Sequence, residues 1–287
     1  MDELLDELRA IEATLGGGVL GVHAVGAASG VTVSYNSGAV FPTASVIKAP
    51  LVAELWAQIA EGKLAPDAKV ALDAGDFVAG SGVLARLEPG HSFTLAELAR
   101  LAICVSDNTA SNAVLRAVGG KDVVNRRMQG DWGMTDTTIH RPIRFHLESG
   151  DPPHTATGTP VDMCRFMSAV AGGRLHSPGV CERLMELLAT CDDTAMLPRY
   201  LEVNAFADDL DVAAPPLAVH HKPGAVTGVR NDAGIVRRTV APFGHVAMAI
   251  YTRGVADSRW TVANRGCEAV ARVAGLVVGR LGFAPTP

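Results

Sequence analysis

The sequence predicts an α+β fold, in which an antiparallel sheet is built from both termini, helices flank it, and an all-helical subdomain is inserted between its two halves. Strand patterns occur near both ends of the chain, at 19–25, 31–36, 217–222, 233–240 and 245–251. Between residues 62 and 200 the sequence shows helical patterns and loops with almost no strand pattern. A sheet that the two ends assemble around a helical insertion accounts for both observations.

The segments at the two ends of the chain justify the sheet and its flanking helices. The chain begins with an acidic amphipathic pattern that places Leu8 and Ile11 on its apolar side. The runs 19–25 and 31–36 are separated by a glycine-containing turn, which predicts an antiparallel hairpin. An apolar-sided pattern from 259 to 281 predicts a long closing helix.

Local signals define the helices of the insertion. Thr94 and Glu97 form a capping-box pattern ahead of an apolar run. The next helix is expected from Asn108 to about Val118, where a glycine pair ends it. Residues 141–160 are rich in Pro, Gly, His and Thr and show no period, which predicts a long loop. A loop of that length inside a compact domain is usually functional or disordered.

The domain organisation follows from length and pattern. The chain has 287 residues, 48% of them hydrophobic, which is enough for one large domain or two intimately joined ones. We expect residues 1–60 and 205–287 to form an α/β subdomain. Residues 61–204 would form the all-helical subdomain, with 141–160 as a long loop at the active site. The cleft is expected at their junction, a common place for small-molecule sites.

Composition excludes several classes of partner. With 25 basic and 30 acidic residues, a net charge of -5 and no Lys/Arg cluster, we expect neither nucleic acid nor an anionic membrane as a partner. No apolar run approaches the roughly 20 residues of a membrane span, and the acidic start has no signal-peptide pattern. Five cysteines without a C-x-x-C pair suit reduced thiols. These features predict a cytoplasmic location.

Metal and cofactor chemistry are not predicted. His140, His146 and His154 share the long loop, but no carboxylate or thiolate stands near them at a metal-ligating spacing. The expected partner is therefore a small-molecule substrate alone, with no cofactor. The sequence gives no indication of the oligomeric state.

A serine and a lysine three residues apart carry the first chemical signal. Ser45 and Lys48 stand at the head of an apolar, helix-patterned run, so their side chains should share one face of its first turns. A serine hydroxyl becomes a nucleophile only when a base removes its proton. Desolvation above an apolar helix can keep the Lys48 amine neutral enough to be that base.

Two further segments complete a set of three ordered motifs. Ser106-Asp107-Asn108 and Lys222-Pro223-Gly224 follow Ser45-x-x-Lys48 along the chain. The set resembles the penicillin-recognising active-site serine family, above all class A β-lactamases and β-lactamase-like serine hydrolases. The first two motifs match in full, and Phe41-Pro42 and Thr159-Pro160 match as well. The resemblance covers most of the chain and implies a β-lactamase/transpeptidase-like fold.

The resemblance also implies an acyl-enzyme mechanism. Ser45 would attack a carbonyl with Lys48 as its proton acceptor. Ser106, beside the second cation Lys222, would pass the proton to the leaving amine. The backbone N–H groups of Ser45 and Ala225 would form the oxyanion hole. The residues implied to bind the substrate are Asn108, Gly224 and Ala225.

Pro223 is the first departure from the family pattern. Relatives carry Thr or Ser at this position, and that hydroxyl would hold a substrate carboxylate, whereas proline supplies neither a hydroxyl nor an N–H. Val226, Thr227 and Arg230 are the substitutes that the sequence offers. We favour Arg230, because its guanidinium fork matches two carboxylate oxygens.

The second departure concerns deacylation. Class A enzymes carry a loop glutamate that activates the deacylating water, in a Glu-x-x-x-Asn pattern shortly after an arginine that Arg141 resembles. The expected places hold Ile143 and Leu147, and neither can act as a base. Glu148 or His146 is the alternative base, although both are more simply read as exposed loop residues. Without a base the acyl-enzyme would form and persist.

Three functions remain open from the sequence. The first is a serine hydrolase that forms an acyl-enzyme on Ser45 and hydrolyses β-lactam amides weakly. The second is an intracellular esterase or peptidase that acts on a small acyl substrate, which the missing export signal favours. The third is a covalent β-lactam-binding module with little turnover, although intact Ser45, Lys48, Ser106 and Asn108 argue against an inactive site.

Overall fold

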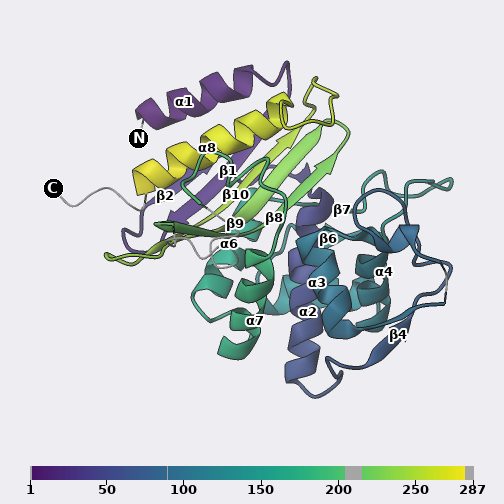
Figure 1. The fold of residues 1–287 in the computed structure, drawn as a ribbon. Helices are drawn as coiled ribbons and strands as arrows, with labels where there is room; N and C mark the ends of the chain where they lie inside the picture. The colour runs from purple at the N-terminus through teal and green to yellow at the C-terminus, as the bar shows by residue number, and fades with distance from the viewer. Residues whose placement is uncertain (1, 89, 204–214, 282–287) are drawn as a thin grey trace.

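The computed structural model describes residues 2–88, 90–203 and 215–281. Its centre is a five-stranded antiparallel sheet whose strands come from both ends of the chain (Figure 1). In spatial order the strands are β2 (Thr32–Tyr35), β1 (Val19–Gly26), β10 (His245–Arg253), β9 (Val229–Arg238) and β8 (Leu217–Val226). The predicted α+β fold is confirmed.

The strand register joins the two ends of the chain. Val22 of β1 pairs with Ile250 of β10, and Lys222 of β8 pairs with Ala233 of β9. Strand β8 lies at the edge of the sheet. The 3-10 turn η1 (Ala44–Ile47) contacts β8 and β9 and so connects the sheet to the helical part of the chain.

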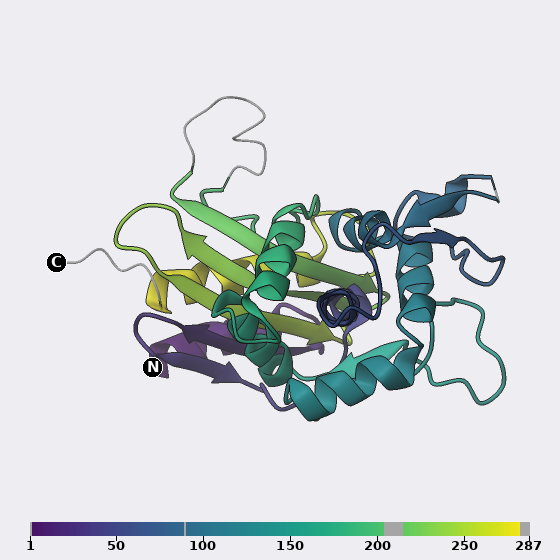
Figure 2. The same ribbon diagram turned by 90° about the horizontal axis from the view of Figure 1, so that it is seen from below.

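Helices cover both faces of the sheet (Figures 1 and 2). On one face lie α1 (Asp2–Ala13) and α8 (Arg265–Leu281), and Leu8 of α1 is fully buried. On the other face α6 (Pro160–Ala171) packs across β1, β9 and β10, and α7 (Pro178–Ala189) packs against β8. The hydrophobic core therefore has two parts, one on each side of the sheet.

The remaining helices pack beside the sheet and carry the serine and its neighbours. They are α2 (Lys48–Ala60), α3 (Leu95–Cys104), α4 (Asn108–Ala117) and α5 (Lys121–Arg126), with a 3-10 turn η2 (Leu84–Arg86) and a π-helical turn η3 (Arg127–Asp131). The predicted capping box is present at the start of α3. Thr94 Oγ1 accepts from Glu97 N (3.2 Å), and Glu97 Oε2 accepts from Thr94 N (2.7 Å).

Short strands correct the prediction of a strand-poor insertion. The described residues between 62 and 200 form four, namely β4 (Lys69–Ala71), β5 (Ser92–Thr94), β6 (Thr138–Ile139) and β7 (Ala156–Gly158). Strand β4 pairs with β5, whereas β7 pairs with β6 and with β3 (Phe41–Pro42). Runs of two or three residues have no local periodicity, so distant pairing decides their conformation.

Two predicted boundaries also change. The closing helix begins at Arg265 rather than at 259, because Asp257 Oδ2 accepts from Arg265 N (2.9 Å) and fixes a turn before it. The loop expected over 141–160 ends at residue 155, because strand β7 begins at Ala156 and pairs with β6 and β3. The boundary expected at 204 and 205 lies at the edge of a range outside the described residues, so the division into subdomains stays a prediction.

Aromatic packing positions the segment that leads to Ser45. The Phe41 ring is fully buried and meets the Tyr251 ring edge to face, with centroids 6.0 Å apart. A side chain at Gly21 would collide with it, since an added Cβ would stand 2.6 Å from the Phe41 ring. Asn231 Nδ2 donates to Pro42 O (2.7 Å) from strand β9. The serine turn is thereby attached to the sheet on two sides.

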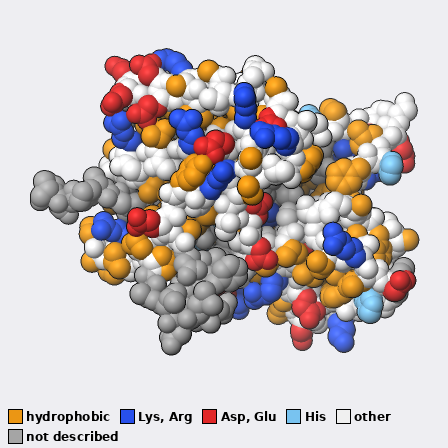
Figure 3. All heavy atoms as spheres, turned by 45° about the horizontal axis from the view of Figure 1, so that its top comes forward, with side chains coloured by type: hydrophobic (Ala, Val, Ile, Leu, Met, Phe, Trp, Pro, Cys, Tyr) orange, Lys and Arg blue, Asp and Glu red, His pale blue; other side chains and the backbone are white. Residues whose placement is uncertain are grey.

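The surface agrees with the mixed composition of the chain. On the face shown in Figure 3, Lys and Arg side chains lie interspersed with Asp and Glu. Within the described ranges, no helix combines the length and hydropathy needed to cross a membrane.

Candidate active site

Ser45 lies in the 3-10 turn η1, directly before α2. The prediction that Ser45 and Lys48 stand at the head of one helix is right in outline, but Ser45 belongs to the tighter turn. The turn begins at Ala44, whose φ of 49° is unusual for a residue with a side chain. The Lys48 backbone N–H donates to Ser45 O and Val46 O, and these bonds join the turn to α2.

Lys48 is fully buried and holds the second motif in place. Its Nζ donates to Ser106 O (2.5 Å), Ser106 Oγ (3.1 Å) and Asn108 Oδ1 (2.7 Å). Burial, and next the charge of Lys222, lower the pKa of Lys48 well below its usual value, although Asp107 opposes the shift. A depressed pKa favours the neutral amine, which is the form that accepts a proton.

Asp107 fixes the geometry of the second motif. Its Oδ1 caps α4 by accepting from Ala110 N (2.9 Å). Its Oδ2 accepts from Val83 N (2.6 Å) and Leu84 N (2.8 Å), which ties the preceding loop to the helix start. Ser106 has a φ of 55°, in the left-handed region, so the backbone turns sharply between α3 and α4. This turn directs both Ser106 oxygens to the Lys48 amine.

The third motif passes close to the serine turn. A Cβ added at Gly224 would stand 2.7 Å from Ser45 N and 2.9 Å from Thr43 O, so only glycine allows this approach. Lys222 is fully buried, and its Nζ donates to Pro223 O (2.9 Å). Burial lowers the pKa of Lys222, while Cys191 and other anionic neighbours oppose the shift. Pro223 lines the cavity and contributes no hydroxyl.

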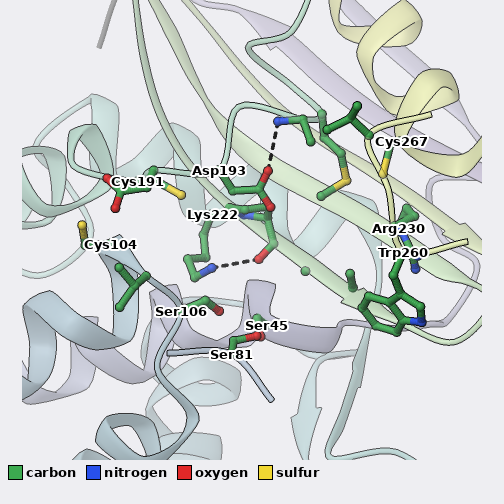
Figure 4. Close-up of a pocket in the computed structure, with 18 of the residues that line it drawn as sticks. Ser45, Ser81, Cys104, Ser106, Cys191, Asp193, Lys222, Arg230, Trp260 and Cys267 are labelled. Atoms are coloured by element: carbon green, nitrogen blue, oxygen red, sulfur yellow. Dashed lines mark hydrogen bonds between the residues drawn. The ribbon is translucent and has the colours of Figure 1, made fainter. Parts of the chain in front are cut away.

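Two cavities meet at Ser45. One has a volume of about 590 Å³ and extends past Lys222 (Figure 4), and the other has about 620 Å³ and extends under the 141–155 loop. The residues that line both are Ser45, Ser81, Ala225 and Trp260. The nucleophile predicted from the sequence is thus at the junction of a two-armed cleft.

Arg230 lies in the wall of the first cavity. Its guanidinium donates to Val226 O (2.8 Å), Val229 O (2.8 Å) and Arg259 O (3.0 Å). It also lies 4.6 Å from the centroid of the Trp260 ring. These contacts fix the Arg230 side chain in the cavity wall, and three of the hydrogen bonds that its guanidinium can donate go to backbone carbonyls. Its role toward a carboxylate stays a prediction.

The long loop places an apolar side chain near Ser45. Asn112 Nδ2 donates to Ile143 O, and Ile143 N donates to Asn112 Oδ1, both at 2.9 Å. Ile143 and Leu147 line the second cavity together with Ser45. Inside the loop, the Arg141 guanidinium donates to backbone carbonyls at 142, 144, 152 and 153.

The alternative bases lie elsewhere. Glu148 and His146 are exposed, and neither lines either cavity at Ser45. The Glu148 backbone N donates to Asp151 Oδ2 (2.9 Å). Glu148 as the deacylation base stays a prediction that this placement does not support. Within the described ranges, no group of three His, Cys, Asp or Glu side chains is arranged to hold a metal ion.

Two features of the cleft cannot be predicted from the sequence. Trp260, which is 66% exposed, lies at the mouth of both cavities, and no local pattern marks it. His221 Nδ1 lies 3.0 Å from each carboxylate oxygen of Asp232, and both side chains are buried behind Cys191. Strand alternation indicates that one of His220 and His221 faces the cleft side, but not that it meets a carboxylate.

Comparison with known proteins agrees with this geometry. The model of the β-lactamase enzyme family matches residues 3–281. The carbapenem-hydrolysing β-lactamase KPC of Klebsiella oxytoca is 34% identical over 248 residues, which cover 83% of this chain and 76% of that protein. The β-lactamase PSE-4 of Pseudomonas aeruginosa is 32% identical over 114 residues, and the match spans only 40% of this chain and 39% of that relative.

A solved structure extends the comparison to the whole fold. The crystal structure of a β-lactamase from Sphaerobacter thermophilus superposes with a TM-score of 0.84 at 27% identity, covering 99% of this chain and 98% of that one. The chain therefore belongs to the β-lactamase enzyme family.

Proposed function

We propose that this protein hydrolyses β-lactam amides through an acyl-enzyme on Ser45 and that deacylation is its slow step. The observation that carries the proposal is the Lys48 amine, which is buried, has a depressed pKa, and is held by Ser106 and Asn108 beside the serine turn. A buried amine with a lowered pKa can accept the proton that a serine hydroxyl must lose to become a nucleophile.

The proton has a short route to the leaving group. In acylation the Ser45 Oγ–carbonyl bond forms, the ring C–N bond breaks, and the proton moves from Oγ to Lys48. Ser106 Oγ accepts a hydrogen bond from Lys48 Nζ at 3.1 Å and would deliver a proton to the amide nitrogen. Lys222, on the same cavity wall, supports this transfer as a second cation.

The developing oxyanion is assigned to backbone donors. The N–H groups of Ser45 and Ala225 are our candidates, because the close approach of Gly224 brings strand β8 against Ser45 N. A donor in such a hole contributes about 3 kcal/mol to transition-state stabilisation. Asn108, and Arg230 with its fixed guanidinium, would bind the amide side chain and the carboxylate of the substrate.

A covalent binding module is the second candidate, and one observation favours it. Ile143 and Leu147 line the cavity beside Ser45 where the family's loop glutamate and its partner are expected. An apolar side chain cannot activate water, so the acyl-enzyme would accumulate with little turnover. The two candidates share every step up to the acyl-enzyme.

A substrate panel tests the proposal. A chromogenic cephalosporin and chromogenic acyl esters are incubated with the wild type, with Ser45→Ala, and with Ser81→Ala as the matched control. Ser81 also lines both cavities but belongs to none of the three motifs. We expect cephalosporin opening to be lost only in Ser45→Ala. Opening that survives Ser45→Ala contradicts the mechanism, and turnover of esters alone would favour the esterase or peptidase.

A further inference from the structure

The cavity arm beyond Lys222 contains two thiols that the acylation mechanism does not use. Cys104 ends α3, Cys191 follows α7, and both line the cavity that holds Ser45 (Figure 4). Their backbones are joined, since Asp192 N donates to Cys104 O (3.1 Å). A small molecule that enters the cleft past Ser45 therefore reaches a wall that presents both cysteines.

Cys191 stands in front of a buried histidine–carboxylate pair. His221 is 2% exposed, and its Nδ1 lies 3.0 Å from both Asp232 oxygens. Asp232 Oδ2 also accepts from Leu197 N (3.0 Å), which fixes the carboxylate. Opposite His221, an added Cβ at Gly234 would stand 2.6 Å from the His221 Cβ, so only a glycine allows β9 to approach this part of β8. The Cys191 thiol, the His221 imidazole and the Asp232 carboxylate follow one another in the order nucleophile, base and orienting group that is typical of an activated nucleophile.

The charges around Cys191 favour its thiolate. Burial lowers the pKa of His221, but the charge of Asp232, and next that of Cys191, raise it to about 10. This imidazole is therefore a cation at neutral pH. Burial likewise raises the pKa of Cys191, yet the charge and hydrogen bonding of His221, together with Lys222, outweigh burial and leave it lowered. His221, Lys222 and Asp232, all buried, thus surround Cys191, and the first two favour the thiolate form of its sulfur.

Cys104 is a natural comparison in the same cavity. Burial, and next the charge of Asp192, raise its pKa. The two thiols line the same cavity, with Cys104 half-buried and Cys191 5% exposed, and their electrostatic surroundings shift their pKa values in opposite directions. The titratable and charged groups around Cys191 are Cys104 on α3, Asp192 and Asp193 after α7, His221 and Lys222 on β8, and Asp232 on β9.

We propose that Cys191 is a covalent modification site for small, soft electrophiles that enter the Ser45 cleft, because its sulfur lines the cavity in front of the His221–Asp232 pair. With an alkyl iodide, the sulfur electron pair forms the S–C bond, the C–I bond breaks, and iodide leaves. The reacting form is the thiolate, so the thiol proton is first lost to the solvent, and His221 keeps its own proton. The adduct occupies the cavity beside Lys222 and removes one negative charge from its surroundings.

Alkylation by iodoacetamide tests this site without any β-lactam, so its outcome is independent of the proposed acylation of Ser45. The wild-type protein is treated at several pH values, and the adducts are quantified by intact mass and assigned by digestion. We expect Cys191 to be modified first, at a rate that levels off below the pH of ordinary thiols. Cys104 should react later, at a rate that rises about tenfold per pH unit.

Variants sharpen the assignment. Cys191→Ser should abolish the fast phase, Cys104→Ser should retain it, and His221→Gln should slow it toward the rate of an ordinary thiol. A fast phase that survives Cys191→Ser, or a wild-type digest in which Cys104 is modified first, overturns the proposal. The digest of the wild-type protein shows which cysteine reacts first, even where a variant does not fold.

Discussion

Asn112 holds Ile143 with both ends of its side-chain amide, through two hydrogen bonds of 2.9 Å. Asn112 belongs to α4, the helix that begins with Asn108, and Asn108 binds Lys48. One helix therefore contacts both Lys48, the proposed proton acceptor, and the loop residue at the expected place of the deacylation base. Ile143 is apolar, so under the proposed mechanism the acyl-enzyme would have no activated water from this position.

Replacing Ile143 by glutamate should speed deacylation. The backbone bonds to Asn112 do not depend on the side chain, so the carboxylate would be presented to the cavity that contains Ser45. We expect Ile143→Glu to raise the deacylation rate by about 10- to 100-fold, below the effect of an optimally placed base. Decay of the acyl adduct measures it. Ile143→Gln, of similar size but without a base, should stay slow, and equal rates in the two variants would refute the argument.

Removal of the Lys48 amine should abolish acylation while the fold persists. Lys48→Met keeps the aliphatic stem in the buried site and deletes the base, so the acylation rate should fall by about 100- to 10,000-fold. Stopped-flow acylation measures the loss. Lys63→Met, in an exposed ion pair with Glu61, is the control for loss of a lysine and should acylate normally. Normal acylation in Lys48→Met would place the base elsewhere.

The acylation rate should depend on the protonation of Lys48. Burial and the charge of Lys222 lower its pKa well below the usual value, and only the neutral amine accepts the proton from Ser45. The rate should therefore rise with pH through this lowered pKa and reach its plateau at a pH where an ordinary lysine is still fully protonated. A pH series of single-turnover acylation tests this. A rate that continues to rise to the usual lysine pKa, about 10.4, would contradict it.

Asp107 should matter for stability. It caps α4 through Ala110 N and accepts the backbone N–H groups of Val83 and Leu84 while 1% exposed. Asp107→Ala removes all three bonds and leaves buried donors unpaired, so we expect a loss of about 2–4 kcal/mol in unfolding free energy. Denaturant unfolding measures it. Asp107→Asn retains one acceptor oxygen and should lose less, and equal losses would show that the bonds are not the cause.

Much of this fold and site can be predicted from local sequence. The strand runs at both ends place the sheet, and the spacing from Ser45 to Lys48 places the proposed nucleophile and the proposed base on adjacent turns. Gly224 is part of the third motif in the sequence. The structure explains why glycine is needed there, because its backbone approaches Ser45 N too closely for a side chain.

Other features depend on distant contacts. Residues 156–158 become a strand only because β3 and β6 lie beside them. Cys191 looks like an ordinary thiol in the sequence, and its surroundings come from His221 and Asp232 on two other elements. Trp260 reaches the cleft because its ring stacks on Arg230. No local period encodes these contacts.

The most direct test of the acyl-enzyme account is time-resolved intact mass spectrometry of the protein mixed with a penicillin, with the adduct mapped by digestion. We predict one covalent adduct on Ser45 that forms quickly, decays slowly, and is absent from Ser45→Ala. An adduct on another residue, or hydrolysed penicillin with no dependence on Ser45, would contradict the account.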